Sequence, residues 1–407
     1  MAMLDHLRIA IPVFKTHVNT LGSTHVFNGD LLDCGLPCAS RHISRGFENE
    51  ILTGDLYHPY ESLPSSYTDM AFKFFTQTTN CLPHVELKAS PLKLLQGHNV
   101  YGFDDIELGA VEMLGLLGDA YPQLCGYLNF AEAQVYHLDT TAFARLPHQG
   151  MVQPVLDFLS SVSSGHRKAK QVKYSNYITW GSENSRRIRP KAYGKFEELK
   201  SQIQALQKRA DKGCHRSKLL VEKSHDVLPF SNAMIRFEGR VCRMHMVDNK
   251  IPTNLWELIK YQKANPSLLD DLWHVVFDPI LTTLKGKDMT YANDDEILDL
   301  LREKLKTTTK KGRISYTKAN NAFRFYSMLR QMGFEQVKTV FAESTFYDNL
   351  NNLLKAGISK AHLQNVHKSK KGAVIPFIRV VEIDFKNQLP PGYVKPTSHY
   401  LHLVKVA

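Results

Sequence analysis

Apolar and polar residues alternate in several short stretches of the first 250 residues, which is typical of strands with one buried face. On this basis strands are predicted at residues 70–75, 84–88, 134–145, 172–180, 187–193 and 233–246. Other stretches have apolar residues three and four positions apart, which predicts helices at residues 104–119, 152–162 and 196–212. Strands interleaved with helices imply an α+β domain on a mainly antiparallel sheet with flanking helices.

The pattern changes after Ile251-Pro252. Helical spacing predicts helices at residues 255–261, 268–284, 294–304, 318–332 and 346–355, and a final apolar run at 374–385 predicts a strand. We therefore expect a first domain over residues 1–250 and a mostly helical domain over residues 251–407. A weaker boundary is expected near Met289.

The C-terminal domain contains a pattern that resembles a helix-turn-helix. Residues 334–341 and 345–355 are its two helices, Ser344 or Thr345 would cap the second, and Gly357 would end it. Residues 374–385 would form a wing. The second helix, beginning at Thr345, would then lie in the major groove of DNA. A packed helical hairpin without DNA contacts is the alternative.

Composition narrows the class of protein. The chain has 407 residues, 43% hydrophobic and 22% charged, which is ordinary for a globular protein. No apolar run approaches the ~18–20 residues that cross a bilayer, and no signal-peptide layout stands at the N-terminus. The six cysteines are scattered, which favours free thiols in a reducing cytoplasm over a zinc site.

Positive charge is concentrated in residues 165–223, which contain 16 Lys and Arg against 5 Asp and Glu. This excess equals the net charge of the whole chain, +11. Such a tract attracts a polyanion, and nucleic acid is favoured over a membrane. Within it, Tyr193 stands among cations that would contact DNA: Arg186, Arg187, Arg189 and Lys191. A solvated charged helix face is the alternative interpretation.

Four segments place reactive side chains on one face of a predicted strand. Residues two apart on a strand share a face, so the sets are Glu86 with Lys88, Asp139 with His137 and Thr141, Arg236 with Glu238 and Arg240, and Tyr193 with Lys195. If these strands are neighbours, carboxylates, cations and a tyrosine share one sheet face. A surface ladder of ion pairs is the alternative for residues 236–240.

This set suits metal-assisted phosphoryl transfer. Carboxylate oxygens favour a hard cation such as Mg²⁺ or Mn²⁺, which polarises a phosphate oxygen. Lys195 and the arginines would favour the phenolate of Tyr193 and stabilise the transition state. Tyr174 and Tyr177 are rival nucleophiles. No two histidines are separated by one residue, so carboxylates would have to hold the metal.

Four segments resemble the gene II replication initiators of filamentous bacteriophages: residues 61–67, 85–91, 95–102 and 236–240. The resemblance implies a rolling-circle initiator that nicks the plus strand at the origin of supercoiled DNA and leaves a 3′-hydroxyl for the host polymerase, with a host helicase as a further partner. It later cuts again and circularises the displaced single strand. The resemblance also implies that residues 289–407 are made separately from an internal start at Met289.

A weaker similarity joins residues 179–195 to plasmid initiators of the trans-acting Rep class. It implies that Tyr193 is the nucleophile, and that Asp139 and Glu238 match metal ligands. Pro190 and Lys191 depart from the apolar residues of that pattern.

We therefore expect a nicking and joining enzyme that forms a covalent 5′-phosphotyrosine. Asp139 and Glu238, with Glu86, would hold the metal, and Lys195, Arg236 and Arg240 would stabilise the phosphoryl charge. A non-catalytic DNA-binding regulator and a nuclease that uses water are the rival functions.

Overall fold

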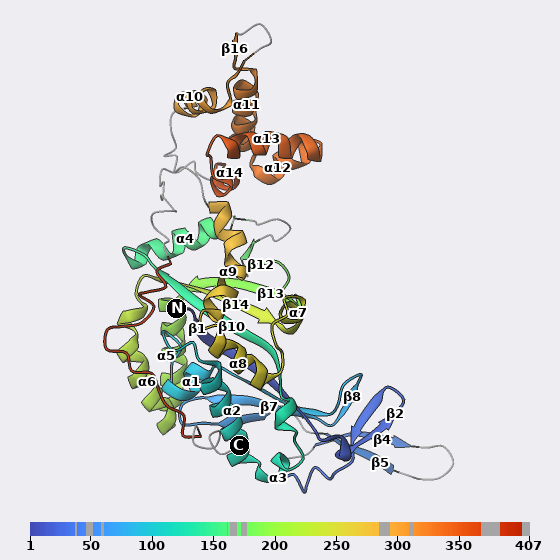
Figure 1. Ribbon diagram of the computed structural model, residues 1–407. Coiled ribbons are helices and arrows are strands. Elements are labelled where there is room, and N and C mark those ends of the chain that lie inside the picture. The colour runs from blue at the N-terminus through green and yellow to red at the C-terminus, as the bar shows by residue number, and fades with distance from the viewer. Residues whose placement is uncertain are drawn as a thin grey trace.

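The fold is built on one large sheet, seen in the computed structural model in Figure 1. The structure describes residues 1–36, 39–45, 52–57, 61–160, 162, 169–171, 177–284, 294–308, 313–367 and 383–400. Among these, the main sheet has nine strands in the order β11-β12-β13-β14-β10-β1-β9-β7-β6. Their bounds are β1 Met3–Pro12, β6 Glu61–Pro64, β7 Asp69–Phe75, β9 His84–Ala89, β10 Gln134–Arg145, β11 Ala169–Gln171, β12 Tyr177–Trp180, β13 Ile188–Gly194 and β14 Met234–Cys242.

Each described pair of neighbouring strands in this sheet is antiparallel. The predicted α+β class, with a mainly antiparallel sheet, flanking helices and a helical C-terminal region, is confirmed. One predicted strand ends earlier than expected, and two elements were not predicted. The strand expected at 233–246 ends at Cys242 and continues as helix α7 (Arg243–Asp248), and the central strand β1 and helix α6 (His215–Val227) were not predicted.

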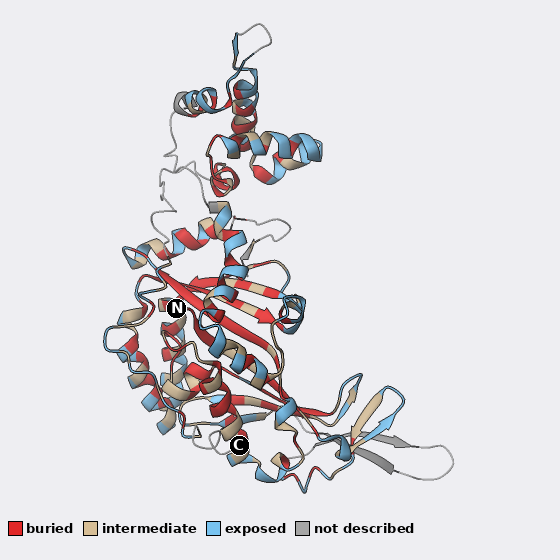
Figure 2. Ribbon diagram, viewed as in Figure 1, coloured by how far each residue is buried: buried red, intermediate tan, exposed pale blue. Residues whose placement is uncertain are grey.

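One face of the sheet carries the main hydrophobic core. Helices α2 (Ile106–Ala120), α8 (Leu255–Ala264) and α9 (Leu268–Leu281) contribute to it, and Figure 2 shows the central strands largely buried. The Trp273 indole on α9 donates a 3.1 Å hydrogen bond to the Phe237 carbonyl on β14. Gly239 allows this close approach, because a Cβ there would lie 3.1 Å from Val276.

The other face is covered at one end only. There Met3, Phe143 and Met234 form a smaller core with residues of α5 (Lys195–Ala210) and α6, and with Leu92 of α1 (Pro91–Gln96). The same strands continue beyond this cover with polar residues on the same face. This end of the sheet holds the candidate site.

Shorter elements complete the first part of the chain. The small sheets are β2 (Val18–Leu21), β3 (Thr24–Phe27) and β8 (Gln77–Thr79) in one, and β4 (Ala39–Arg45) with β5 (Leu52–Tyr57) in another. The remaining helices are α3 (Pro122–Cys125) and α4 (Val152–Leu159), with 3-10 turns at Lys15–His17, Phe130–Glu132, Gln149–Met151, Pro229–Ser231 and Thr282–Leu284. No helix in the described part of the chain has the length and apolar character needed to span a membrane.

A second core joins the helices of the C-terminal part, which lie together apart from the sheet in Figure 1. They are α10 (Asp294–Leu305), α11 (Thr317–Met332), α12 (Phe334–Val340), α13 (Glu343–Lys355) and α14 (Lys360–Asn365), with a hairpin of β15 (Thr307–Thr308) and β16 (Ile314–Ser315). Helices α8 and α9 share the core of the sheet, so this core continues past residue 250, and it also includes Ala361 of α14 and the partly buried Ile383 and Phe385. The domain division drawn at residue 250 stays a prediction of the sequence.

Helices α12 and α13 match the two helices of the predicted helix-turn-helix. The predicted cap is wrong, because α13 begins at Glu343 after Ala342 and has no side-chain cap. Gly357 has φ +93°, as expected of a residue that ends a helix. Most of the predicted wing, residues 374–382, lies outside the described residues, and residues 383–385 are not a strand.

Residues 383–400 pack on the first part of the chain. The Gln388 side chain, 2% exposed, accepts from the Phe143 backbone N–H at 2.8 Å and donates to the Phe143 carbonyl at 2.9 Å. Phe143 lies beyond the last residue of β10 that pairs with β1, so Gln388 takes the place of a neighbouring strand. Ser398 donates to Glu112 of α2 at 2.7 Å.

Gln388→Ala leaves both backbone groups of Phe143 buried without partners. We expect a loss of ~1–3 kcal/mol in the free energy of unfolding, measured by urea titration. Lys386→Ala, on the exposed part of the same segment, is the matched control and should change stability by less than ~0.5 kcal/mol. Equal stability of the wild type and Gln388→Ala would contradict this docking.

Candidate functional site

The register of β13 and β14 brings the predicted residues to one face. Tyr193 lies opposite Arg236, and Lys191 lies opposite Glu238. Residues directly opposite one another in an antiparallel pair share a face. The next pair along, Arg189 and Arg240, continues the same stripe.

Strands β10 and β1 extend this face. Asp139 lies opposite Arg240 on β14 and opposite His6 on β1. Arg240 binds Asp139 through two hydrogen bonds of 2.7 Å, from Nε and Nη2 to the two carboxylate oxygens. Asp139 is 1% exposed, so this bidentate ion pair is largely shielded from water.

The Tyr193 hydroxyl donates a 3.3 Å hydrogen bond to Glu238 Oε2. The side chain is 6% exposed, and Lys191 Nζ lies 4.7 Å from the ring centroid and 3.7 Å from the same Glu238 oxygen. Burial raises the pKa of Tyr193 well above 10, against the opposite effect of Arg236. Arg236 thus lowers the pKa of Tyr193, as expected of a neighbouring cation, but the effect of burial is larger.

Glu238 stands where carboxylates converge. Burial raises the pKa of Glu238, and the negative charges of Asp5 and Asp139 raise it further, against the effect of Lys191. The position therefore favours a proton or another positive charge.

Lys195 is fully buried and begins α5 rather than ending the strand. Its Nζ donates to Asn99 Oδ1 at 2.9 Å and to Glu198 Oε2 at 2.6 Å, and lies 5.9 Å from the Tyr193 ring centroid. Burial lowers the pKa of Lys195 to about 8. Asn99 and Glu198 thus hold the buried ammonium group of Lys195 close to the Tyr193 ring.

Arg236 is also fully buried, with its Nη2 atom 3.0 Å from Asp5 Oδ1. Asn99 Nδ2 donates to the same Asp5 oxygen at 2.8 Å, and the Asn99 carbonyl accepts from Arg236 Nη1. Although burial alone would raise it, Arg236 and Asn99 bring the pKa of Asp5 down to about 2. The ion pair fixes Arg236 beneath Tyr193.

Sequence reasoning missed Asp5, Asn99 and Glu198. Asp5 falls at a register irregularity of β1, between Leu4 opposite Thr140 and His6 opposite Asp139, so it breaks the simple alternation. Asn99 belongs to residues 95–102, one of the segments that carry the family resemblance, and this was the only available signal for it.

Glu86 is not brought together with Asp139 and Glu238. It lies on β9 opposite Ala10, four positions along β1 from the His6–Asp139 pair. Arg8 binds it, with the closest atoms 2.6 Å apart. In the described part of the chain, no group of three or more His, Cys, Asp or Glu side chains is close enough to hold a metal by itself.

Two of the predicted DNA-binding cations, Arg189 and Lys191, lie on β13 together with Tyr193. Arg189 and Lys191 line a cavity of about 300 Å³ together with Glu238, Arg240, Tyr177 and Trp180. Arg186 and Arg187 are exposed in the turn before β13, where Arg187 binds Asp248 at 2.8 Å. Thr345 is exposed on α13, away from this sheet.

Of the rival tyrosines, Tyr177 lies opposite Tyr193 on β12, and Tyr174 lies outside the described residues.

Two histidines stack beside Asp139: His137, which the sequence placed on the same strand face, and His6, which it did not select. The rings of His6 and His137 lie 5.4 Å apart between centroids. Burial lowers the pKa of His6 to about 4, and it also lowers the pKa of His137. Both rings are therefore neutral at pH 7.

Comparisons with known proteins match the N-terminal and C-terminal parts of this chain to one protein family. Residues 3–264 match the family model for the N-terminal region of the phage replication-associated protein encoded by gene II, and residues 308–399 match the model for its C-terminal region. The replication-associated protein of Salmonella phage IKe is 34% identical over 89% of this chain and 88% of its own length. The proteins of the same name from Enterobacteria phages fd and M13 are 31% identical over 89% of this chain and 90% of theirs. No solved structure is significantly similar.

The neutral state of His6 predicts a loss of stability in acid. Between pH 6.5 and about 4 the unfolded chain binds a proton at this histidine and the folded chain does not, so the free energy of unfolding falls as pH falls. Urea titrations at pH 7 and pH 5 should show a decrease to which His6 contributes on the order of 1–2 kcal/mol. His6→Gln should reduce the decrease, and His215→Gln, at an exposed position of α6, should leave it as in the wild type. An identical pH dependence in His6→Gln and wild type would contradict the buried neutral ring.

Proposed function

This chain belongs to the family of gene II replication-associated proteins of filamentous phages, and from that premise we propose that it nicks and rejoins one DNA strand through Tyr193. The observation that carries the proposal is the hydrogen bond from the Tyr193 hydroxyl to Glu238, beside the Asp139–Arg240 pair on the same sheet face. The nick would start and end rolling-circle replication at the plus-strand origin.

The chain's own residues account for the transfer. The Tyr193 oxygen attacks the phosphorus, the bond to the 3′-oxygen breaks, and the 5′-phosphate becomes linked to the tyrosine. The hydroxyl proton passes to Glu238 Oε2, the acceptor already 3.3 Å away. The 3′-oxygen leaves with a proton from water. One phosphodiester replaces another, so the strand is resealed by the reverse attack without ATP.

The cations of the site form two groups, two that line the cavity and two that are fully buried. Arg240 and Lys191 line the open cavity next to Glu238, where they can contact the phosphate oxygens. Arg236 and Lys195 are fully buried below Tyr193 and do not reach the DNA. Their positive charges stabilise negative charge that develops on the tyrosine oxygen during attack.

We propose that a divalent cation, Mg²⁺ or Mn²⁺, binds at the carboxylates of this site. Magnesium is usually held by one or two protein carboxylates together with phosphate oxygens, so a three-residue cage is not required. The pKa of Glu238, raised by burial and by the neighbouring carboxylates Asp5 and Asp139, marks a point that favours added positive charge. Asp139 and Glu238 would hold the ion, which supplies Lewis-acid polarisation of a phosphate oxygen. Glu86, on β9 with Arg8, would not take part.

The DNA partners follow from the same proposal. Arg186, Arg187, Arg189 and Lys191 would contact the phosphates of the origin, and α13, from Thr345 onward, would contact duplex DNA. Supercoiled origin DNA and the displaced single strand would be the substrates, a host helicase would unwind the duplex, and a host polymerase would extend the 3′-end. The bacterial cytoplasm is the place of action.

Tyr193→Phe should reduce nicking of supercoiled origin DNA at least ~10³-fold, because it removes the oxygen that accepts the 5′-phosphate in the proposal. Gel electrophoresis of the relaxed product measures the rate, and a filter-binding assay should show unchanged affinity for origin DNA. Tyr177→Phe, which removes the neighbouring hydroxyl on β12, is the matched control and should nick.

Normal nicking by Tyr193→Phe would instead favour a nuclease that uses water. One observation speaks for that function, because burial raises the pKa of Tyr193 and disfavours the free phenolate.

Asp139→Asn and Glu238→Gln keep the side-chain shapes and remove one negative charge each. Both should lower the nicking rate and shift its half-maximal Mg²⁺ concentration upward by about tenfold or more, measured by titration with MgCl₂ after treatment with EDTA. Glu86→Gln should keep the wild-type Mg²⁺ dependence. Full activity of the wild type in EDTA would rule out the metal site.

A further inference from the structure

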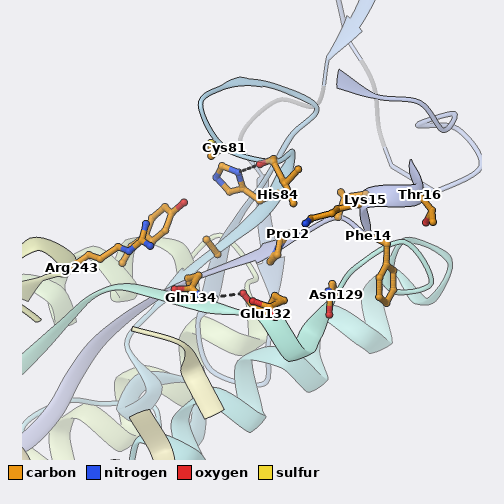
Figure 3. A pocket seen from close by; sticks show the side chains of 14 residues that line it. Pro12, Phe14, Lys15, Thr16, Cys81, His84, Asn129, Glu132, Gln134 and Arg243 are labelled. Atoms are coloured by element: carbon orange, nitrogen blue, oxygen red, sulfur yellow. Dashed lines mark hydrogen bonds between the residues drawn. The ribbon is translucent and has the colours of Figure 1, made fainter. Parts of the chain in front are cut away.

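A second cavity, of about 660 Å³, lies on the same face of the sheet as Tyr193 (Figure 3). Ala10 and Pro12 of β1 and His84 of β9 line it, and in the β1–β9 register they alternate with the residues that pack into the main core. These residues share their face with Arg8, which lies opposite His137 on β10. The cavity is therefore continuous with the face that carries Asp139.

Strand β10 connects the two places. From Asp139 the strand runs through His137 and Tyr136 to Gln134, which lines the cavity. Five residues of strand correspond to roughly 16 Å, a distance that a few nucleotides span. The Arg8 guanidinium lies 5.4 Å from the Tyr136 ring centroid and provides a positive charge along this path.

The cavity has cations at both ends and aromatic rings between them. Figure 3 shows Arg243 at one end and Lys15 at the other, with His84 between them. The Arg243 guanidinium lies 5.9 Å from the Tyr136 ring centroid, and Phe14 is 41% exposed at the Lys15 end. Within the described residues, neither Lys15 nor Arg243 forms a salt bridge with a carboxylate.

The volume and the lining both suit a nucleotide. Cavities of 300–1,000 Å³ take small organic ligands, and proteins hold single strands by stacking bases on aromatic rings while cations follow the phosphates. Tyr136, His84 and Phe14 offer the rings, and Lys15 and Arg243 offer the charges. Gln134 and Glu132 add hydrogen-bonding groups at the wall.

We propose that this cavity binds a nucleotide of the single strand that leads away from the phosphate held at Tyr193. The proposal rests on the proposed function and adds a second contact to it, a few nucleotides from the nick. The strand would cross the sheet face along β10, past Arg8, and enter the cavity with its base against Tyr136. Holding the strand at two points would keep the cleaved end in place for rejoining.

The double variant Phe14→Ala/Arg243→Ala tests the proposal in the full chain. Fluorescence anisotropy measures the Kd of two labelled oligonucleotides, a short one that covers only the cleavage site and one extended on both sides to reach the cavity. We expect the extended oligonucleotide to bind the wild type more tightly than the short one. We expect the double variant to lose about tenfold of that gain. Lys260→Ala, at an exposed position of α8 outside the cavity, is the matched control and should keep the full gain.

Phe14 and Arg243 are both exposed, and a thermal unfolding curve like that of the wild type confirms that the double variant is folded. An undiminished gain in the folded double variant would overturn the proposal. Complete displacement of the extended oligonucleotide by dAMP alone would also overturn it, because the cavity would then serve free nucleotides. Covalent adduct formation on the short oligonucleotide reports only the chemistry at Tyr193. Failure of the nicking proposal would therefore appear as absence of this adduct. Failure of the cavity proposal would appear in how the Kd depends on oligonucleotide length.

Discussion

The antiparallel register of β13, β14 and β10 is the constraint on which the site depends. It sets Lys191 opposite Glu238 and Asp139 opposite Arg240, and it places Tyr193 on the same face. A shift of one residue would turn every one of these side chains to the opposite face, into the core covered by α9. Because Gly239 lets α9 approach β14 closely, packing on the apolar face holds the register of the polar face.

Beneath this surface, charged groups are buried only in pairs. Arg236 is balanced by Asp5, and Lys195 by Glu198, with Asn99 bonded to both cations. A buried charge without a partner is strongly destabilising, so these pairs are needed simply to fold the site. They also place two positive charges under a tyrosine whose own pKa is raised by burial. Burial thus keeps the Tyr193 hydroxyl protonated in the free protein, and in the proposed attack the two buried charges would stabilise the negative charge on its oxygen.

How much of this could be predicted depends on whether the signal was local. Alternation within a strand is a local signal, so the sequence correctly predicted that Asp139, Glu238 and Tyr193 lie on the same sheet face. The sequence did not predict that Glu86 lies apart from Asp139 and Glu238, because its offset from Asp139 is set by pairing through β1, a strand that was not predicted. Asp5 was hidden by a register irregularity that interrupts the alternation of β1. The family was visible from short segments, whereas the high pKa of Tyr193 comes from burial that no segment encodes alone.

The most direct test of the account is to locate the DNA on the protein. The wild type is incubated with an origin oligonucleotide and Mg²⁺, the covalent adduct is isolated under denaturing conditions and digested, and the peptide that carries the nucleotide is identified by mass spectrometry. The account predicts a nucleotide on the Tyr193 oxygen. Attachment to Tyr177 or to another residue, or cleavage of the strand with no adduct at all, would contradict it.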